Sequence, residues 1–129
     1  MYKFMAVVII GMLLFVLFIA GIGVAEAIER VGGPQGDRLV GTEADDVLRG
    51  KKGNDAILGR SGSDVLRGAR GHDTINAGPG RDSVMASRGN DTVNLLDGGG
   101  EDEAFCGKGH DTVYRDAGDT VHFCEIERR

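Results

Sequence analysis

Aspartate recurs at every ninth position through the middle of this chain, and its carboxylate is a strong ligand for hard divalent cations. The regular series comprises Asp37, Asp46, Asp55, Asp64, Asp73, Asp82 and Asp91. Glycines between these acids permit tight turns that bring backbone carbonyls toward a common point. Calcium suits such donors best, since it accepts about 6–8 oxygen ligands in adaptable geometry, whereas magnesium prefers a stricter octahedron and zinc prefers nitrogen and sulfur. The residue types and their spacing therefore predict several bound calcium ions.

The aspartates are one column of a nine-residue repeat that covers residues 32–94 in seven copies. Aspartate holds the sixth place of every copy, and glycine usually holds the first. The eighth place is always a branched aliphatic residue, namely Leu39, Leu48, Ile57, Leu66, Ile75, Val84 and Val93. The fourth place is glycine in the last five copies, at Gly53, Gly62, Gly71, Gly80 and Gly89. Two columns kept through seven copies indicate a repeat architecture rather than a flexible glycine-rich linker.

Each copy has the pattern of a turn followed by a short strand. Glycine, asparagine, aspartate and serine favour turns in the first six places, and the last three places form a strand whose middle side chain points inward. Two copies close one coil, and successive coils stack as parallel strands about 4.8 Å apart. We therefore expect an all-β fold, a parallel β-roll (right-handed β-solenoid) with a thin aliphatic core. Gln35 and Ala44 replace the fourth-place glycine in the first two copies, which are expected to act as caps.

Alternate copies fall on opposite edges of such a roll, so that carboxylates of like charge are stacked. One edge would carry Asp55, Asp73 and Asp91, and the other would carry Asp46, Asp64 and Asp82. A thin core cannot offset much of the resulting repulsion, whereas calcium between the coils removes it. Folding would then be coupled to metal binding. The alternative that remains open is a metal-free stack of Asx turns.

The unit resembles the glycine- and aspartate-rich nonapeptide of RTX, or haemolysin-type, calcium-binding proteins. The resemblance covers residues 32–94 and resumes at residues 106–114. It implies a β-roll with calcium held between turns two repeats apart, by sixth-place acids, turn carbonyls and fifth-place residues. The residues so implied are Asp37, Asp46, Asp55, Asp64, Asp73, Asp82, Asp91, Asp111, Asp45, Asn54, Ser63, His72, Asn90, Gly50, Gly53, Gly59, Gly62, Gly68 and Gly71.

Departures from the family pattern predict weaker or fewer sites toward the C-terminal copies. The second glycine of the motif remains only at Gly33, Gly78 and Gly107. Ala77 and Ala86 replace the first-place glycine, and the charge of Arg81 is unfavourable beside a cation.

The N-terminal residues have the pattern of a targeting segment. Lys3 precedes an apolar run at residues 4–24, and a small-x-small site follows at residues 25–27. The pattern predicts a hydrophobic signal helix over residues 1–27, cleaved after Ala27, and a calcium-binding domain over residues 28–129. The run is also long enough for an uncleaved membrane anchor, which would bring the protein to a membrane. Either arrangement places the repeats outside the cytoplasm, with residues 28–31 as a short leader.

The phase of the repeat breaks after Asn94. Residues 95–105 contain an acidic, glycine-rich segment, which we expect to be an exposed loop, with an extra cation site as the alternative. The motif returns at residues 106–114, where Asp111 holds the sixth place, and residues 119–121 repeat its ending.

The chain has two cysteines, Cys106 and Cys124, which are eighteen residues and therefore one coil apart. In an exported chain we expect them to form a disulfide that caps the C-terminal end of the roll. Loop closure would make it worth about 3 kcal/mol.

Composition and motifs argue against catalysis and against nucleic acid as a partner. The formal net charge is −5, which disfavours nucleic acid, and the chain has neither H-E-x-x-H nor G-x-S-x-G. His72, His110 and His122 fit turn or surface positions. We expect a secreted, extracellular, calcium-binding module that is not an enzyme.

Two alternatives remain open at this stage. One is a calcium-stabilised adhesion or carbohydrate-binding accessory module whose partner is an extracellular polysaccharide or a cell surface, and the other is a polysaccharide-modifying enzyme. Arg49 and Arg67 hold the ninth place one coil apart. We expect them on a solvated face, with a docking stripe for an anionic partner as the other interpretation.

Overall fold

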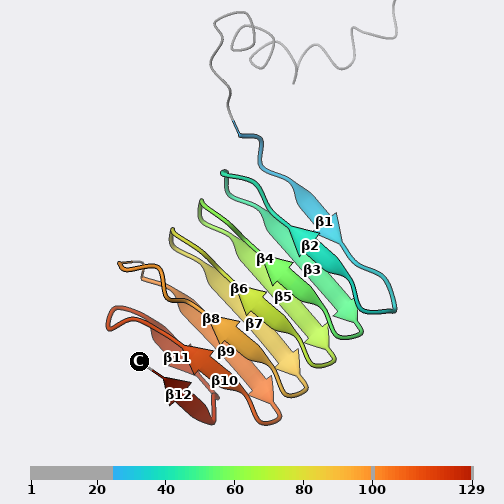
Figure 1. Ribbon diagram of the computed structural model, residues 1–129, viewed down its shortest axis with the longest axis vertical. Helices are drawn as coiled ribbons and strands as arrows, with labels where there is room; N and C mark the ends of the chain where they lie inside the picture. The colour runs from blue at the N-terminus through green and yellow to red at the C-terminus, as the bar shows by residue number, and fades with distance from the viewer. Residues whose placement is uncertain (1–24, 100, 129) are drawn as a thin grey trace, which may run out of the picture.

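The computed structural model describes residues 25–99 and 101–128, which form a parallel β-solenoid of stacked coils (Figure 1). Two six-stranded sheets lie face to face. The odd sheet has the order β1-β3-β5-β7-β9-β11, and the even sheet has the order β12-β10-β8-β6-β4-β2. The described residues contain no helix, and hence none that could cross a membrane. The expected signal helix falls, apart from residues 25–27, outside the described residues.

The strands of the odd sheet are β1 (Glu29–Val31), β3 (Val47–Lys52), β5 (Val65–Arg70), β7 (Ser83–Arg88), β9 (Glu103–Lys108) and β11 (Thr120–His122). The strands of the even sheet are β2 (Arg38–Val40), β4 (Ala56–Leu58), β6 (Thr74–Asn76), β8 (Thr92–Asn94), β10 (Thr112–Tyr114) and β12 (Ile126–Arg128).

The even sheet confirms the expected strand in the last three places of a repeat. Its strands β2, β4, β6 and β8 pair in parallel with a register of one coil, so that Leu39, Ile57 and Ile75 lie side by side. The eighth-place residues of both sheets point inward and are buried, as expected from strand alternation. The core therefore consists of two facing aliphatic columns, to which Ala77, Ala86, Leu95 and Cys106 are added toward the C-terminus.

The odd sheet differs from the expectation, because most of its strands are six residues long and extend through the first three places of the next repeat. Pairing continues past the second place, with Lys51 opposite Ala69 and Lys52 opposite Arg70. The second place itself has a positive φ, 81° at Lys51 and 85° at Ala69. This local reversal of the backbone lets the chain stay hydrogen-bonded to its neighbour while it begins to turn.

The segment before the first repeat is part of the roll. Strand β1 pairs with β3 in parallel, and the backbone N–H of Ile28 donates a hydrogen bond to Asp46 Oδ1 at 2.7 Å. Residues 28–31, expected as a short leader, therefore complete the first coil.

The expectation of an exposed loop for the acidic, glycine-rich insertion at residues 97–103 is correct for Gly98, Gly99 and Glu101 and wrong for its last two residues. Asp102 is buried, and strand β9 begins at Glu103. Residues 95–105 form an eleven-residue repeat, in which two additional residues are accommodated in the turn, where Gly98 and Gly99 are exposed.

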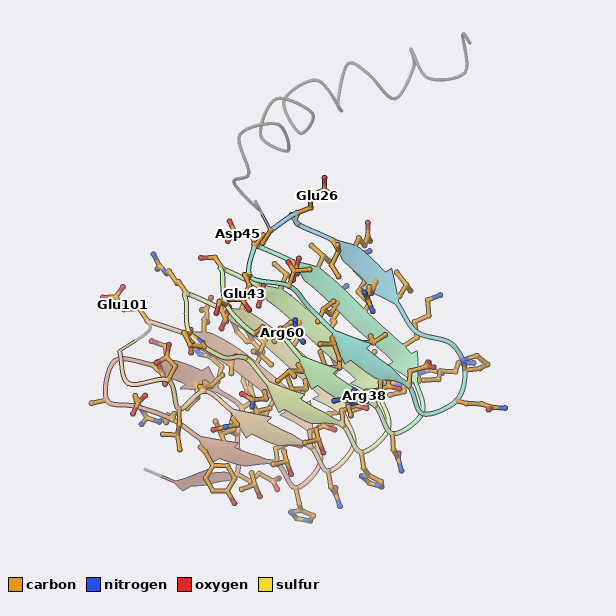
Figure 2. The ribbon with its side chains drawn as sticks, turned by 45° about the horizontal axis from the view of Figure 1, so that its top comes forward. Glu26, Arg38, Glu43, Asp45, Arg60 and Glu101 are labelled. Atoms are coloured by element: carbon orange, nitrogen blue, oxygen red, sulfur yellow. A yellow bond between two sulfur atoms is a disulfide. The ribbon has the colours of Figure 1, made fainter. Side chains whose placement is uncertain are left out.

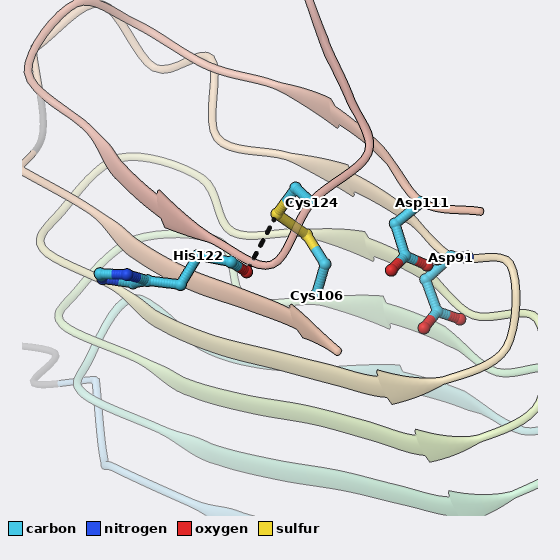
Figure 3. The surroundings of a disulfide bond; sticks show 5 residues. All are labelled: Asp91, Cys106, Asp111, His122 and Cys124. Atoms are coloured by element: carbon cyan, nitrogen blue, oxygen red, sulfur yellow. Dashed lines mark hydrogen bonds between the residues drawn. A yellow bond between two sulfur atoms is a disulfide. The ribbon is translucent and has the colours of Figure 1, made fainter. Parts of the chain in front are cut away.

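The disulfide between Cys106 and Cys124 is present, as the one-coil spacing indicated (Figure 3). The Cα atoms of the two cysteines are 5.1 Å apart, and Cys106 is fully buried in the core. The bridge joins β9 to the segment that follows β11 and closes the C-terminal end of the roll.

The positive φ of the second place predicts that Ala69→Gly stabilises the protein. A side chain in this backbone region costs about 1–2 kcal/mol, which exceeds the entropic cost of glycine, so we expect a gain of about 0.5–1 kcal/mol. Urea unfolding followed by circular dichroism measures it. Ala56→Gly is the matched control, because Ala56 is an exposed residue of strand β4 that is not among the residues with positive φ, and it should lose stability. Equal effects of the two substitutions would contradict this account.

Candidate metal centre

The sixth-place aspartates are connected from coil to coil by one repeated hydrogen bond. The backbone N–H of each aspartate donates to Oδ1 of the aspartate one coil further on. The bonds of the seven regular repeats are Asp37 to Asp55 (2.8 Å), Asp46 to Asp64 (2.7 Å), Asp55 to Asp73 (2.8 Å), Asp64 to Asp82 (2.7 Å) and Asp73 to Asp91 (2.8 Å). The acids of alternate repeats therefore form two separate columns, as expected from the coil period.

Both columns lie inside the roll. Asp46, Asp55, Asp64, Asp73, Asp82 and Asp91 are each no more than 2% exposed, whereas Asp37 of the first repeat is half-buried. Asp91 and Asp111 have adjacent carboxylates near the disulfide (Figure 3), and the N–H of Asp91 donates to Asp111 Oδ1 at 2.9 Å.

The second oxygen of most of these carboxylates has no hydrogen-bond partner within the described residues. These buried atoms are Oδ2 of Asp55, Asp64, Asp73, Asp82, Asp91, Asp102 and Asp111. The first two repeats differ, because Oδ2 of Asp37 accepts the N–H of Gly33 at 2.5 Å and Oδ2 of Asp46 accepts the N–H of Thr42. An unpaired buried carboxylate oxygen is costly unless a cation or a proton compensates it.

The space beside the first-place glycine receives this second oxygen together with a backbone carbonyl. A Cβ placed on Gly59 would lie 2.5 Å from Asp64 Oδ2 and 2.4 Å from the carbonyl oxygen of Ala77 in the next coil. A Cβ on Gly41 would meet the equivalent oxygens of Asp46 and Gly59 at 2.5 and 2.2 Å. A carboxylate and a carbonyl thus converge on a space that only glycine leaves open, and both are donors that calcium prefers.

The later repeats fill this space with side-chain atoms. Their first-place residues are Ala77, Ala86, Leu95 and Cys106, and all four are fully buried in the core. The sequence departure noted at Ala77 and Ala86 therefore coincides with a more apolar surrounding of the following aspartates.

Burial raises the pKa of the stacked carboxyls. Desolvation, together with the negative charges of Asp102 and Asp64, raises the pKa of Asp82 from 3.8 to about 7. The pKa values of Asp91 and Asp102 rise to about 6 for the same reason. Burial also raises the pKa of the earlier acids of the columns, namely Asp55, Asp64 and Asp73. The largest shifts thus follow Ala77, Ala86 and Leu95.

The fifth-place side chains form a separate ladder at the exposed surface. Oδ1 of Asn54 accepts the N–H of His72 at 2.9 Å, Nδ1 of His72 accepts the N–H of Asn90 at 2.8 Å, and Oδ1 of Asn90 accepts the N–H of His110 at 3.0 Å. On the other edge, Oδ1 of Asp45 accepts the N–H of Ser63 at 2.7 Å. These side-chain atoms already accept hydrogen bonds from the backbone, so a metal would be bound at the fifth place by a backbone carbonyl oxygen rather than by the side chain.

The fourth-place glycines lie against the carbonyls of the preceding coil. A Cβ on Gly71 would be 1.8 Å from the carbonyl oxygen of Gly53, and a Cβ on Gly80 would be 1.8 Å from that of Gly62. Gly71 and Gly80 have φ values of 135° and 145°. From Gly53 to Gly89 this column is therefore restricted to glycine by both space and backbone conformation, and it lines the turns with carbonyl oxygens.

Two acids of the columns, Asp102 and Asp119, were missed by sequence reasoning as candidate ligands. Asp82 donates its N–H to Asp102 Oδ1 at 2.8 Å, and Asp102 donates to Asp119 Oδ1 at 3.2 Å. Residues 102–104 and 119–121 each have an aspartate followed two residues later by an apolar residue, as in the sixth and eighth places of the repeat. This pattern could have identified both acids. The additional turn residues before Asp102 concealed it.

No group of three or more acidic, histidine or cysteine side chains gathers in the described part of the chain. Each coil instead contributes one carboxylate to each column, so a cation would have to be held by stacked coils together with their backbone carbonyls.

Comparison with known families agrees with this repeat geometry. Residues 31–66 and 58–93 match the family described as RTX calcium-binding nonapeptide repeat (4 copies). No curated protein and no solved structure matches the chain significantly. Through residues 31–93 the chain therefore belongs to the RTX calcium-binding nonapeptide-repeat family.

Proposed function

We propose that the protein is a secreted, non-catalytic module that binds several calcium ions between its coils and folds on binding them. The observation that carries the proposal is the column of buried Oδ2 atoms without hydrogen-bond partners. A calcium ion held there would neutralise stacked carboxylates and accept their oxygens and the turn carbonyls as ligands.

The folded chain places these acids where they cannot be solvated. Asp55, Asp64 and Asp73 belong to successive repeats and are almost fully buried. Oδ1 of each accepts a hydrogen bond from a backbone N–H one coil away. Without compensation, the ionised carboxylates repel each other and lose their hydration, which opposes folding. Binding free energy therefore becomes folding free energy.

The first-place residue divides the roll into two parts. We assign the stronger calcium sites to the repeats that begin with Gly50, Gly59 and Gly68, where Oδ2 of the following aspartate has no hydrogen-bond partner within the described residues. Weaker or absent sites follow Ala77, Ala86 and Leu95, because their side chains occupy the corresponding space.

Secretion is supported by two features of the chain. A disulfide joins Cys106 to Cys124, and such bridges persist outside the reducing cytoplasm. The apolar run at residues 4–24 fits a signal peptide or an anchor. Extracellular calcium reaches the range of about 10⁻⁴–10⁻³ M at which extracellular sites bind.

Calcium titration of the chelator-treated protein tests the proposal directly. We expect the far-UV circular dichroism to gain β signal cooperatively with calcium, at about 10⁻⁴–10⁻³ M, and not with magnesium at the same concentrations. A β spectrum that is the same with chelator and with calcium, in protein that elemental analysis shows to be free of metal, would refute calcium-coupled folding.

Gly59→Ala tests the space beside the carboxylate. The new Cβ would contact Asp64 Oδ2 and the Ala77 carbonyl, so we expect the calcium midpoint to rise by about tenfold and the calcium-loaded form to lose about 1–3 kcal/mol. Isothermal titration calorimetry and urea unfolding measure the two effects. The matched control is Gly99→Ala, because a Cβ on Gly99 meets nothing within 4 Å. The assignment fails if both variants bind calcium like the parent.

The raised pKa values predict that protons replace part of the effect of calcium. In chelator, Asp82 with a pKa of about 7, and Asp91 and Asp102 with pKa values of about 6, bind protons more tightly in the folded state than in the unfolded state. Their contribution to stability is therefore complete below the unfolded pKa of 3.8 and is lost as the pH rises through about 6–7.

Thermal unfolding at about pH 5 and about pH 8 measures this dependence. We expect the chelated chain to be more stable at the lower pH. In saturating calcium the order should reverse, because protons compete with the metal for the stacked carboxylates of the repeats that begin with glycine. The same pH slope in chelator and in calcium would show that the stacked carboxylates do not bind the ion.

A further inference from the structure

Four cationic side chains form a column along one edge of the roll. They hold the third place of alternate repeats and end the strands β3, β5, β7 and β9, and they are Lys52, Arg70, Arg88 and Lys108. Strand pairing places Lys52 opposite Arg70, Arg70 opposite Arg88, and Arg88 opposite Lys108. Their backbones are therefore separated by one strand spacing, about 4.8 Å. We call these four residues the cation column.

The cation column is not neutralised by the protein. All four residues are exposed, and none of their side chains makes an ion pair or a hydrogen bond with the described residues. Like charges directly opposite each other on neighbouring strands are destabilising. The column is thus a row of unpaired positive charge on a chain whose net charge is −5.

Acidic side chains are concentrated on the other edge. Glu43 and Asp45 precede strand β3 and Glu101 precedes β9, so they lie where the odd strands begin, while the cation column lies where they end. Figure 2 shows these three acids on one side of the roll, together with Glu26. The exposed charges of the two edges are therefore opposite in sign, and an extended anion would be attracted to one edge and repelled from the other. The carboxylates of Asp55, Asp73, Asp91 and Asp111, which follow the cation column in the same turns, are buried.

We propose that the cation column binds a linear acidic polysaccharide that carries an anionic group on each sugar ring. A straight row of equally spaced cations fits a polymer whose charges also repeat along a line. One ring of a linear polysaccharide has a length close to the strand spacing, so consecutive rings can meet consecutive coils. The phosphates of a DNA duplex follow a helical path around its axis, so a straight row of cations fits them less well.

An aromatic pair lies at the C-terminal end of the same sheet. Phe105 of strand β9 stacks on His122 of β11, with ring centroids 4.5 Å apart and an interplanar angle of 13°. Both side chains are partly exposed, and Phe105 is three residues before Lys108 on the same strand. Three residues of a strand span about 10 Å, so a sugar chain that crosses the C-terminal end of the cation column can place a ring against this aromatic pair. The cations supply affinity and orientation, and the aromatic pair offers an apolar surface.

Binding of chondroitin sulfate to the full-length chain in calcium-containing buffer tests the proposal. Chondroitin sulfate carries a carboxylate or a sulfate on each successive ring, and neutral dextran serves as the uncharged comparison. The variant Arg70→Gln/Arg88→Gln removes the centre of the cation column. Arg38→Gln/Arg60→Gln is the matched control, because it makes the same change in net charge at arginines outside the column (Figure 2).

We expect chondroitin sulfate to bind and dextran not to bind. The column variant should lose affinity by about tenfold or more, while the control variant stays within about twofold of the parent. Absence of chondroitin sulfate binding by folded protein, or an equal loss in both variants, would overturn the proposal. Duplex DNA that bound as tightly as chondroitin sulfate through the same residues would also overturn the assignment to a polysaccharide.

The inference rests on the proposed calcium function only because polysaccharide binding requires the folded roll. Circular dichroism of the same samples separates the two proposals. A chain that is folded but does not bind chondroitin sulfate refutes the polysaccharide surface, whereas a chain that calcium does not fold refutes the calcium function.

Discussion

The repeated hydrogen bond between the backbone N–H of one aspartate and the carboxylate of the aspartate one coil further on is the constraint on which this structure depends. It fixes the distance between coils, draws each acid into the interior and leaves the second carboxylate oxygen without a partner, as at Asp64 and Asp73. The core that must compensate is only two aliphatic columns deep. A small apolar core rarely provides more than a narrow margin of stability, so the charges inside this roll decide whether it folds.

The architecture was predictable because two columns of the repeat reflect two independent structural requirements, one for the core and one for the turns. The aliphatic eighth place specifies one inward side chain per strand, and the sixth-place aspartate specifies where each coil turns. Together they indicated the coil period, the separation of the acids into two columns and the pairing of Cys106 with Cys124. All three follow from counting residues, since every coil repeats the same backbone path.

The remaining features depend on backbone conformation and local packing, which a column of residue types does not show. Positive φ at Lys51 and Ala69 allows the odd strands to continue into the next repeat, although neither residue type signals it. Asp102 escaped recognition because the turn before it absorbs two additional residues without changing the path of the next strand. The role of the first place was also hidden. In the sequence, glycine at this place indicates only a turn. The structure shows that a side chain there would contact the carboxylate of the aspartate in the same repeat.

The two halves of the roll meet the same electrostatic problem in different ways. Near the N-terminus, glycine leaves space beside each carboxylate, so the charge can be compensated by a bound cation. Toward the C-terminus, Ala77, Ala86 and Leu95 enlarge the core, and the disulfide at Cys106 restrains the last coil. The acids that follow them, Asp82, Asp91 and Asp102, have pKa values raised by burial and by neighbouring negative charges. Since each coil contacts only its neighbours, the proposed calcium function would make the C-terminal end, which depends less on metal, the template on which the N-terminal coils stack.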